Sequence, residues 1–119
     1  KRCCRAIHQG TPPASPEDLM RARYAAYAVG AVEFILASTD PRGPHFEAER
    51  GGWRESVARF CRETEFLGLE VLESSAEGES GQVAFRVQLL QAGRDASFGE
   101  RSSFRRVDGA WLYHSGTAI

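Results

Sequence analysis

The sequence has no apolar run close to the roughly 18 residues needed to span a bilayer, and it has no excess of either charge. Its 15 basic and 16 acidic residues give a net charge of −1. That balance provides no bulk attraction to nucleic acid or to a membrane surface. It contains only three cysteines, and the odd number argues against a disulfide framework. We therefore expect no nucleic-acid partner, no membrane association and a reducing, cytoplasmic setting.

The sequence also lacks the local motifs of the common catalytic sites. It has no Ser-His-Asp order, no glycine-rich phosphate loop and no H-E-x-x-H helix. Cys61 has no histidine beside it by local spacing, which favours a small core residue over a nucleophile. His45 falls in a proline-rich loop and His114 on the outer face of a predicted strand, so both are expected at the surface. We predict no catalytic residue.

The first half of the chain is predicted to be helical after an irregular start. Residues 1–14 are expected to be irregular because Gly10-Thr11-Pro12-Pro13 cannot continue a helix or a central strand. The clearest helix begins after Ser15, a good N-cap three residues before Asp18, and ends at Gly30. The expected helices span residues 16–29, 31–38 and about 47–64.

The second half is predicted to form antiparallel strands. The expected strands span residues 66–74, 82–92, 96–107 and 110–116. Asp108-Gly109 is a strong signal for a two-residue hairpin turn. Counting outward from this turn pairs Arg106 with Trp111, Phe104 with Tyr113, Ser102 with Ser115 and Ser103 with His114. Helices followed by a meander of strands indicate an α+β fold, and 119 residues suit one domain, which we place at residues 15–119.

Three stretches resemble the YchJ-like family, small bacterial proteins associated with the SEC-C motif. They are Leu19-Met20-Arg21-Ala22-Arg23-Tyr24-Ala25-Ala26-Tyr27, Phe66-Leu67-Gly68-Leu69-Glu70-Val71, and the hairpin formed by Glu100-Arg101-Ser102-Ser103-Phe104 and Trp111-Leu112-Tyr113-His114-Ser115-Gly116. Leu112 and Ser115 depart from the family pattern, which has an aromatic residue and Asp there. The resemblance implies a nuclear-transport-factor-2-like cone, with N-terminal helices packed on a curved antiparallel sheet of about four strands.

Cys3-Cys4 resembles the end of a SEC-C zinc motif, so residues 1–14 are interpreted as a remnant of that motif. A structural zinc site needs four nitrogen or sulfur ligands. Cys3, Cys4 and His8 supply three at most, and the preceding C-x-C is absent. The sequence begins at Lys1 without an initiator methionine, which suggests a trimmed N-terminus. We expect no cofactor in this chain, and zinc only if the missing N-terminal ligands are present.

A concave space is expected where the bent sheet wraps over the first helix. Arg23 lies on the apolar stripe of that helix and needs a partner, for which Glu100 on the aromatic face of the hairpin is the best candidate. This pair is either a structural lock or part of a polar-ended pocket. The predicted ligand-binding residues are Arg23, Tyr24, Tyr27, Glu100, Phe104, Trp111 and Tyr113.

Two functions remain open at this point. The first is a non-catalytic accessory domain that binds a small ligand or a protein partner, because the related zinc motif of the SecA translocase is a docking element. The alternative is a small enzyme of the isomerase, dehydratase or hydrolase type that uses the pocket. The alternative gains support if Arg23 and Glu100 are out of hydrogen-bond reach and Glu100 opens to a cavity.

Overall fold

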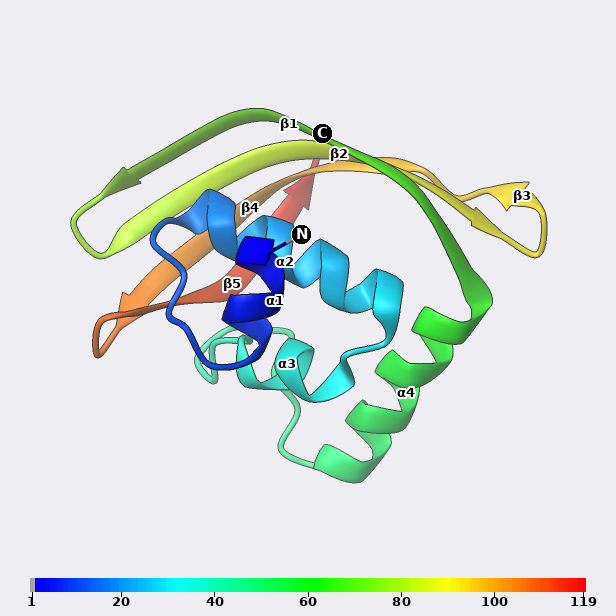
Figure 1. The fold of residues 1–119 in the computed structure, drawn as a ribbon, viewed down its shortest axis with the longest axis horizontal. Coiled ribbons are helices and arrows are strands. Elements are labelled where there is room, and N and C mark those ends of the chain that lie inside the picture. The colour runs from blue at the N-terminus through cyan, green and yellow to red at the C-terminus, as the bar shows by residue number, and fades with distance from the viewer. Residues whose placement is uncertain (1) are drawn as a thin grey trace.

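In the computed structural model, residues 2–119 form four helices followed by a five-stranded antiparallel sheet, with side chains described from Cys4 onward (Figure 1). The helices are α1 (Arg2–His8), α2 (Pro16–Val29), α3 (Val32–Ala37) and α4 (Arg50–Glu63). The strands are β1 (Thr64–Glu77), β2 (Ser80–Gln91), β3 (Arg94–Asp95), β4 (Phe98–Val107) and β5 (Ala110–Ala118). The sheet order is β1-β2-β4-β5, with β3 paired to β2. The expected α+β class is confirmed.

Helix α2 lies under the bent sheet, and its two ends are fixed by the residues that the sequence indicates. The Ser15 hydroxyl accepts a hydrogen bond from the backbone N–H of Asp18 at 3.1 Å, and Pro16 occupies the first turn. Gly30 ends the helix in a left-handed conformation with φ of 76°. Leu19, on the buried side, is 1% exposed.

The prediction that residues 1–14 are irregular is wrong in part, because Arg2–His8 form α1. The helix packs Cys4 and Ile7 against Ala22 of α2. The His8 ring adds a contact of 2.7 Å between its Nε2 and the carbonyl of Ala22. Helix α1 depends on this packing partner, which is distant in sequence. A seven-residue segment is too short to be recognised as a helix from its own residues.

The β4–β5 hairpin follows the predicted register only near its turn. Arg106 pairs with Trp111 and Phe104 with Tyr113, as expected. A β-bulge then inserts His114 as an extra residue, so that Ser103 faces Ser115 and Ser102 faces Gly116. The predicted pairs of Ser102 with Ser115 and of Ser103 with His114 are therefore wrong. Beyond the bulge, every residue of β5 faces the side opposite to the predicted one.

The connection between α3 and α4 pairs with the edge of β5 at this bulge. The backbone N–H of Tyr113 donates to the carbonyl of Ser38 at 2.9 Å, and the N–H of Asp40 donates to the carbonyl of Tyr113 at 2.8 Å. Gly43 lies so close to the backbone of His114 that a Cβ there would overlap its carbonyl. The bulge is thus set by a long-range contact that fixes the position of Tyr113.

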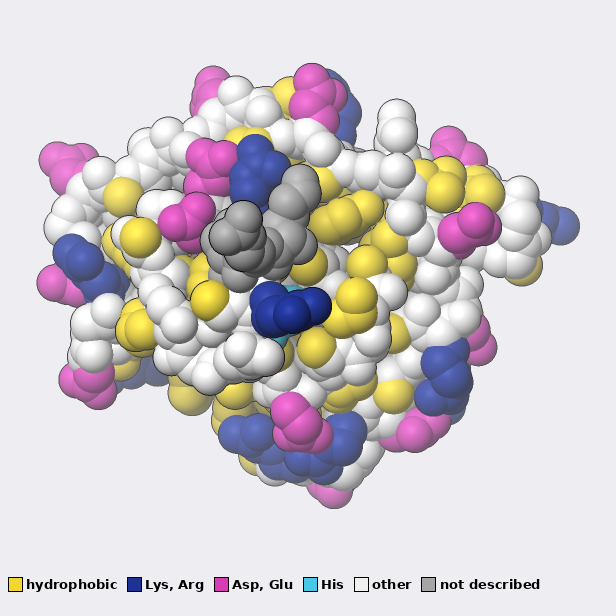
Figure 2. All heavy atoms as spheres, in the orientation of Figure 1, with side chains coloured by type: hydrophobic (Ala, Val, Ile, Leu, Met, Phe, Trp, Pro, Cys, Tyr) yellow, Lys and Arg dark blue, Asp and Glu magenta, His cyan; other side chains and the backbone are white. Residues whose placement is uncertain are grey.

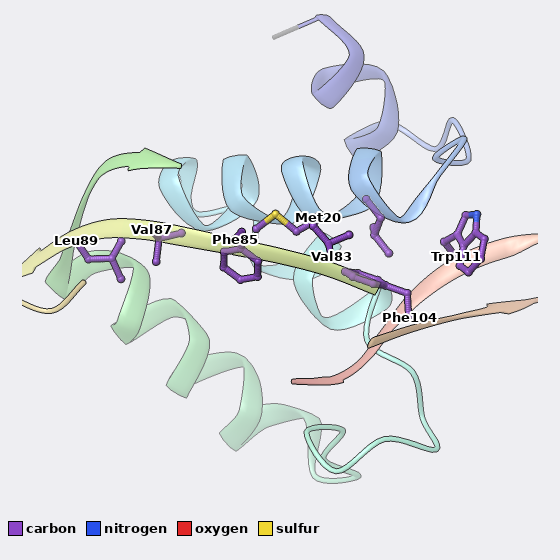
Figure 3. Close-up of a cluster of buried hydrophobic side chains, with 8 residues drawn as sticks. Met20, Val83, Phe85, Val87, Leu89, Phe104 and Trp111 are labelled. Atoms are coloured by element: carbon purple, nitrogen blue, oxygen red, sulfur yellow. The ribbon is translucent and has the colours of Figure 1, made fainter. Parts of the chain in front are cut away.

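The core lies between α2 and the concave face of the sheet, as Figure 3 shows. Its buried residues are Leu19, Met20, Val83, Phe85, Val87, Leu89, Phe104 and Trp111. A second cluster joins α2, α3 and α4 through Ala26, Ile35, Leu36, Trp53 and Val57. Because α2 contributes to both clusters, it ties the helical layer to the sheet.

The surface carries both charges in close mixture. On the face drawn in Figure 2, basic and acidic side chains are interspersed. Exposed ion pairs include Arg21–Glu17 at 2.9 Å and Arg101–Glu73 at 3.1 Å. No helix within residues 2–119 is long and apolar enough to cross a membrane.

Candidate functional site

A cavity of about 350 Å³ lies between the concave face of the sheet and helices α2 and α4. Most of its wall is apolar, with Met20, Trp53, Val57, Phe60, Phe66, Phe85, Val87, Leu89, Phe98 and Phe104. Polar groups gather in the rest of the lining, which includes Arg23, Tyr24, Tyr27, Thr39, His45, Glu47, Glu100, Ser102 and Tyr113. We call the group formed by Arg23, Tyr27, Glu100, Ser102 and Tyr113 the polar end.

Six of the seven predicted ligand-binding residues line this cavity, and Trp111 does not. Trp111 is buried in the core, beyond Phe104 and at the opposite end from Leu89 (Figure 3). The guanidinium of Arg106 lies 5.2 Å from its ring centroid. Trp111 shares a face with Tyr113, but two residues along a strand separate the side chains by roughly 7 Å, so only Tyr113 reaches the cavity.

Arg23 does not form the predicted ion pair with Glu100. The two N–H groups of its Nη1 atom are instead shared among three acceptors at the end of α3: the Ile35 carbonyl at 3.1 Å, the Ser38 hydroxyl at 2.7 Å and the Thr39 hydroxyl at 3.2 Å. Carbonyl groups at a helix C-terminus favour a cation, which explains the choice of partner. The guanidinium also lies over the ring of Tyr113, 4.5 Å from its centroid.

Ser38 and Thr39 were not predicted as partners of Arg23, because only the three-dimensional fold brings the end of α3 beside α2. Their position at the end of a short predicted helix was the one available signal, since hydroxyl groups often satisfy helix ends. Burial lowers the pKa of Arg23, and the neighbouring Tyr27, Tyr113 and Glu100 oppose that effect.

Glu100 is held by two hydroxyl groups at the polar end. Its Oε2 atom accepts hydrogen bonds from Ser102 at 2.6 Å and from Tyr113 at 3.0 Å. Gly116 of β5 lies directly against the carboxylate, and a Cβ at that position would overlap it. The bulge at His114 puts Gly116, and not Ser115, opposite Ser102. The register shift therefore makes the space that the Glu100 side chain occupies.

Tyr113 connects the cation and the carboxylate of the polar end. Its ring lies under Arg23, and its hydroxyl donates to Glu100. Burial raises the pKa of Tyr113 strongly, and the negative charge and hydrogen bond of Glu100 raise it further, against a smaller opposing effect of Arg23. The phenol therefore stays neutral and keeps donating its proton to the carboxylate.

We expect Gly116→Ala to move the Glu100 carboxylate away from Tyr113, because the added methyl group overlaps its present position. Since Glu100 contributes to the raised pKa of Tyr113, the pKa should fall towards that of an ordinary tyrosine, about 10. Ultraviolet titration of phenolate absorbance measures this change. Gly99→Ala is the matched control, because a methyl group there meets the side chains of Ile119 and Arg86 instead. Identical titration curves for the two variants would contradict the assignment.

The three histidines lie in different parts of the described structure. His8 contacts the ring of Phe34 at 4.7 Å between centroids, and His114 Nδ1 lies 2.9 Å from the Ser115 hydroxyl. His45 is exposed, as expected, but it also lines the cavity, with its ring 5.6 Å from that of Tyr113. Its loop position gave no signal of this role.

The predicted metal ligands are only partly within the described structure. The side chain of Cys3 lies outside the described residues, whereas Cys4 is buried in the contact between α1 and α2. No group of three or more His, Cys, Asp or Glu residues in the described part of the chain could hold a metal ion. Cys61 packs at the edge of the helical cluster, as the sequence favoured, and burial raises the pKa of its thiol.

A curved antiparallel sheet that wraps over helices and encloses a polar-ended cavity defines the nuclear-transport-factor-2-like fold, and the predicted fold class is confirmed. The sequence pattern of the family described as "YchJ, middle NTF2-like domain" matches residues 15–116. The chain belongs to this family.

Relatives at moderate identity support the assignment. The chain is 35% identical over 120 residues to a UPF0225 protein from Streptomyces coelicolor, covering 98% of this chain and 86% of the relative. It is 33% identical over 120 residues to a UPF0225 protein from Serratia proteamaculans, covering 97% and 75% respectively. The solution structure of a SEC-C motif containing protein from Rhodopseudomonas palustris is similar, with a TM-score of 0.83 and 36% identity over 99% of this chain and 90% of that one.

Proposed function

We propose that this domain binds a small, mostly apolar ligand whose polar head lies against Arg23, Glu100 and Tyr113. The observation that carries the proposal is the cavity, whose volume of about 350 Å³ falls in the range of roughly 300–1,000 Å³ that is usual for small-molecule sites. An apolar wall supplies affinity by removing ligand surface from water, and a few converging polar groups fix its orientation. A concave, mostly apolar site of this size favours a small molecule over a protein partner.

We expect Val87→Phe to weaken the binding of apolar dyes or fragments by at least about tenfold, because the added ring occupies the cavity that they need. Fluorescence titration with an environment-sensitive dye and fragment NMR on the intact chain measure the change. Near-ultraviolet circular dichroism shows whether the variant keeps its packed core.

Val29→Phe is the matched control, since Val29 is 73% exposed at the end of α2 and does not line the cavity. It should bind the probes like the wild type. If the wild type gives no saturable binding, or if both variants bind alike, the proposed function is wrong.

An enzyme is the second candidate, and one observation favours it. Glu100 forms no direct ion pair with Arg23 and lines the cavity, so its carboxylate could accept a proton from a bound substrate. Gly116→Ala separates the two functions, because it displaces the carboxylate and leaves the apolar wall in place. A reaction that uses Glu100 would be lost in this variant while apolar fragments still bind.

We propose that the domain works in the cytoplasm, without a nucleic-acid or membrane partner. The odd number of cysteines supports a reducing compartment. The near-neutral charge and its mixed distribution support the absence of a polyanionic partner. Zinc is proposed only for a longer chain that supplies the ligands before Cys3.

A further inference from the structure

We infer that the ligand's head group is neutral and carries a hydrogen-bond donor next to an acceptor, as a primary carboxamide does. The inference rests on the proposed function and narrows it to a ligand class. Its basis is that Arg23 and Glu100 carry opposite charges and line the same cavity. Each forms hydrogen bonds with other groups and not with the other residue.

The acceptor for the head group is the second carboxylate oxygen of Glu100. Both hydroxyl groups that hold Glu100 donate to Oε2, and in the described structure no hydrogen bond reaches Oε1. No buried side-chain oxygen or nitrogen of the described residues lacks a partner. Oε1 is therefore accessible, and it can accept a hydrogen bond from an N–H or O–H of a ligand.

The donors for the head group lie on Arg23 and Tyr27. All three hydrogen bonds of Arg23 to the end of α3 use Nη1, so Nε and Nη2 take no part in them, and the guanidinium also interacts with the Tyr27 side chain. The Tyr27 hydroxyl lies beside this guanidinium, and both residues line the cavity. The polar end thus presents donors and an acceptor to the same ligand.

Neither charge can move away to admit a charged head group. Arg23 is pinned by three hydrogen bonds and by the ring of Tyr113, and Glu100 by two hydroxyl groups and by Gly116. A carboxylate would be repelled by Glu100, and an ammonium group by Arg23, in a site where burial strengthens both effects. A neutral amide meets both residues without leaving a buried charge unpaired.

The test compares three compounds that share one benzyl body: 2-phenylacetamide, phenylacetate and 2-phenylethylammonium. Their dissociation constants are measured by NMR titration of the intact chain at pH 7. We expect the amide to bind at least about tenfold more tightly than either charged compound. If phenylacetate binds most tightly, the charge of Arg23 determines the affinity and the inference is wrong. If 2-phenylethylammonium binds most tightly, the charge of Glu100 determines the affinity and the inference is also wrong.

Failure of the inference is distinguishable from failure of the proposed function. A different order of the three compounds, or apolar dyes that bind while the amide does not, overturns the inference alone. If neither the dyes nor any of the three compounds bind saturably, the proposed function falls and the inference falls with it.

A charge variant assigns the preference to the polar end. Glu100→Gln should raise the affinity for phenylacetate relative to the amide by about tenfold, because the repulsion is removed while the side-chain shape is kept. Glu77→Gln removes one negative charge at an exposed position outside the cavity and should leave this ratio unchanged. Equal changes of the ratio in both variants would show that net charge sets it, and would overturn the inference.

Discussion

Replacing Arg23 with alanine is expected to lower the free energy of unfolding by about 3 kcal/mol. The substitution removes three hydrogen bonds and the contact with the Tyr113 ring, and it leaves a void in a site where Arg23 is 8% exposed. The Ile35 carbonyl keeps donors in the hydroxyl groups of Ser38 and Thr39, so no buried backbone acceptor is orphaned. Breaking a buried charge pair usually costs about 3–5 kcal/mol. The loss for Arg23→Ala should therefore lie at the lower end of that range.

Urea unfolding of the wild type and of Arg23→Ala measures the difference in unfolding free energy. A nearby arginine provides the control. Arg21 lies two residues away on α2, where it forms an exposed pair with Glu17 at 2.9 Å. Arg21→Ala should cost no more than about 0.5 kcal/mol, as is usual for exposed helix pairs. A cost for Arg23→Ala as small as that for Arg21→Ala would show that Arg23 does not join α2 to α3.

Asp40→Asn is expected to lower the free energy of unfolding by about 2 kcal/mol at neutral pH. Asp40 is 1% exposed, and its carboxylate accepts hydrogen bonds from Arg105 Nη1 at 2.8 Å and from the N–H of Arg42 at 3.0 Å. An asparagine amide presents one acceptor and one donor group, so it cannot satisfy both partners. The charge of Arg105 also loses its counterpart.

The effect should depend on pH. Burial alone would raise the pKa of Asp40, but the N–H of Arg42 and the Arg105 guanidinium outweigh it, so the pKa is lowered on folding. A lowered pKa stabilises the fold above the unfolded-state value of about 3.9, and the stabilisation is lost as the pH falls through the folded-state value. The difference between wild type and Asp40→Asn should therefore narrow below about pH 4.

Urea unfolding at pH 7 and at pH 3 tests both parts of this prediction. Asp95 provides the control, because its Oδ1 accepts from the N–H of Ser97 at 2.9 Å in the same local arrangement, but at an exposed position. Asp95→Asn should shift the unfolding midpoint much less. A pH-independent difference for Asp40→Asn would exclude its carboxylate charge as the cause.

Local signals predicted the elements of the fold well, because both ends of α2 and the hairpin turn are encoded by neighbouring residues. Ser15, Gly30 and Asp108-Gly109 each act within a few residues, so their effects can be recognised without knowing the fold. The resemblance to a family then supplied the arrangement of these elements.

The errors in side-chain and strand pairing concern contacts between distant segments. Arg23 was assigned to Glu100 because both belong on facing surfaces, but the end of α3 offers a nearer set of acceptors. The bulge at His114 depends on pairing with Ser38 and Asp40, which no pattern within the hairpin reveals. Most residues of the candidate site could be predicted, because the helix and strand patterns show which face each residue occupies. Their hydrogen-bond partners could not be predicted, because those depend on tertiary structure.

The pairing of residues 38–40 with β5 also bears on the order in which the molecule assembles. Asp40 and Arg105 are 65 residues apart in the chain, so their contact closes a long loop and carries the entropy cost of doing so. During synthesis the last strand emerges after all the helices, and until it docks, Arg23 lacks the Tyr113 ring and Glu100 lacks one of its two donors. The apolar wall between α2 and β2 can form earlier from segments already made. The polar end is therefore completed late in folding, only when β5 is in place beside α2 and residues 38–40.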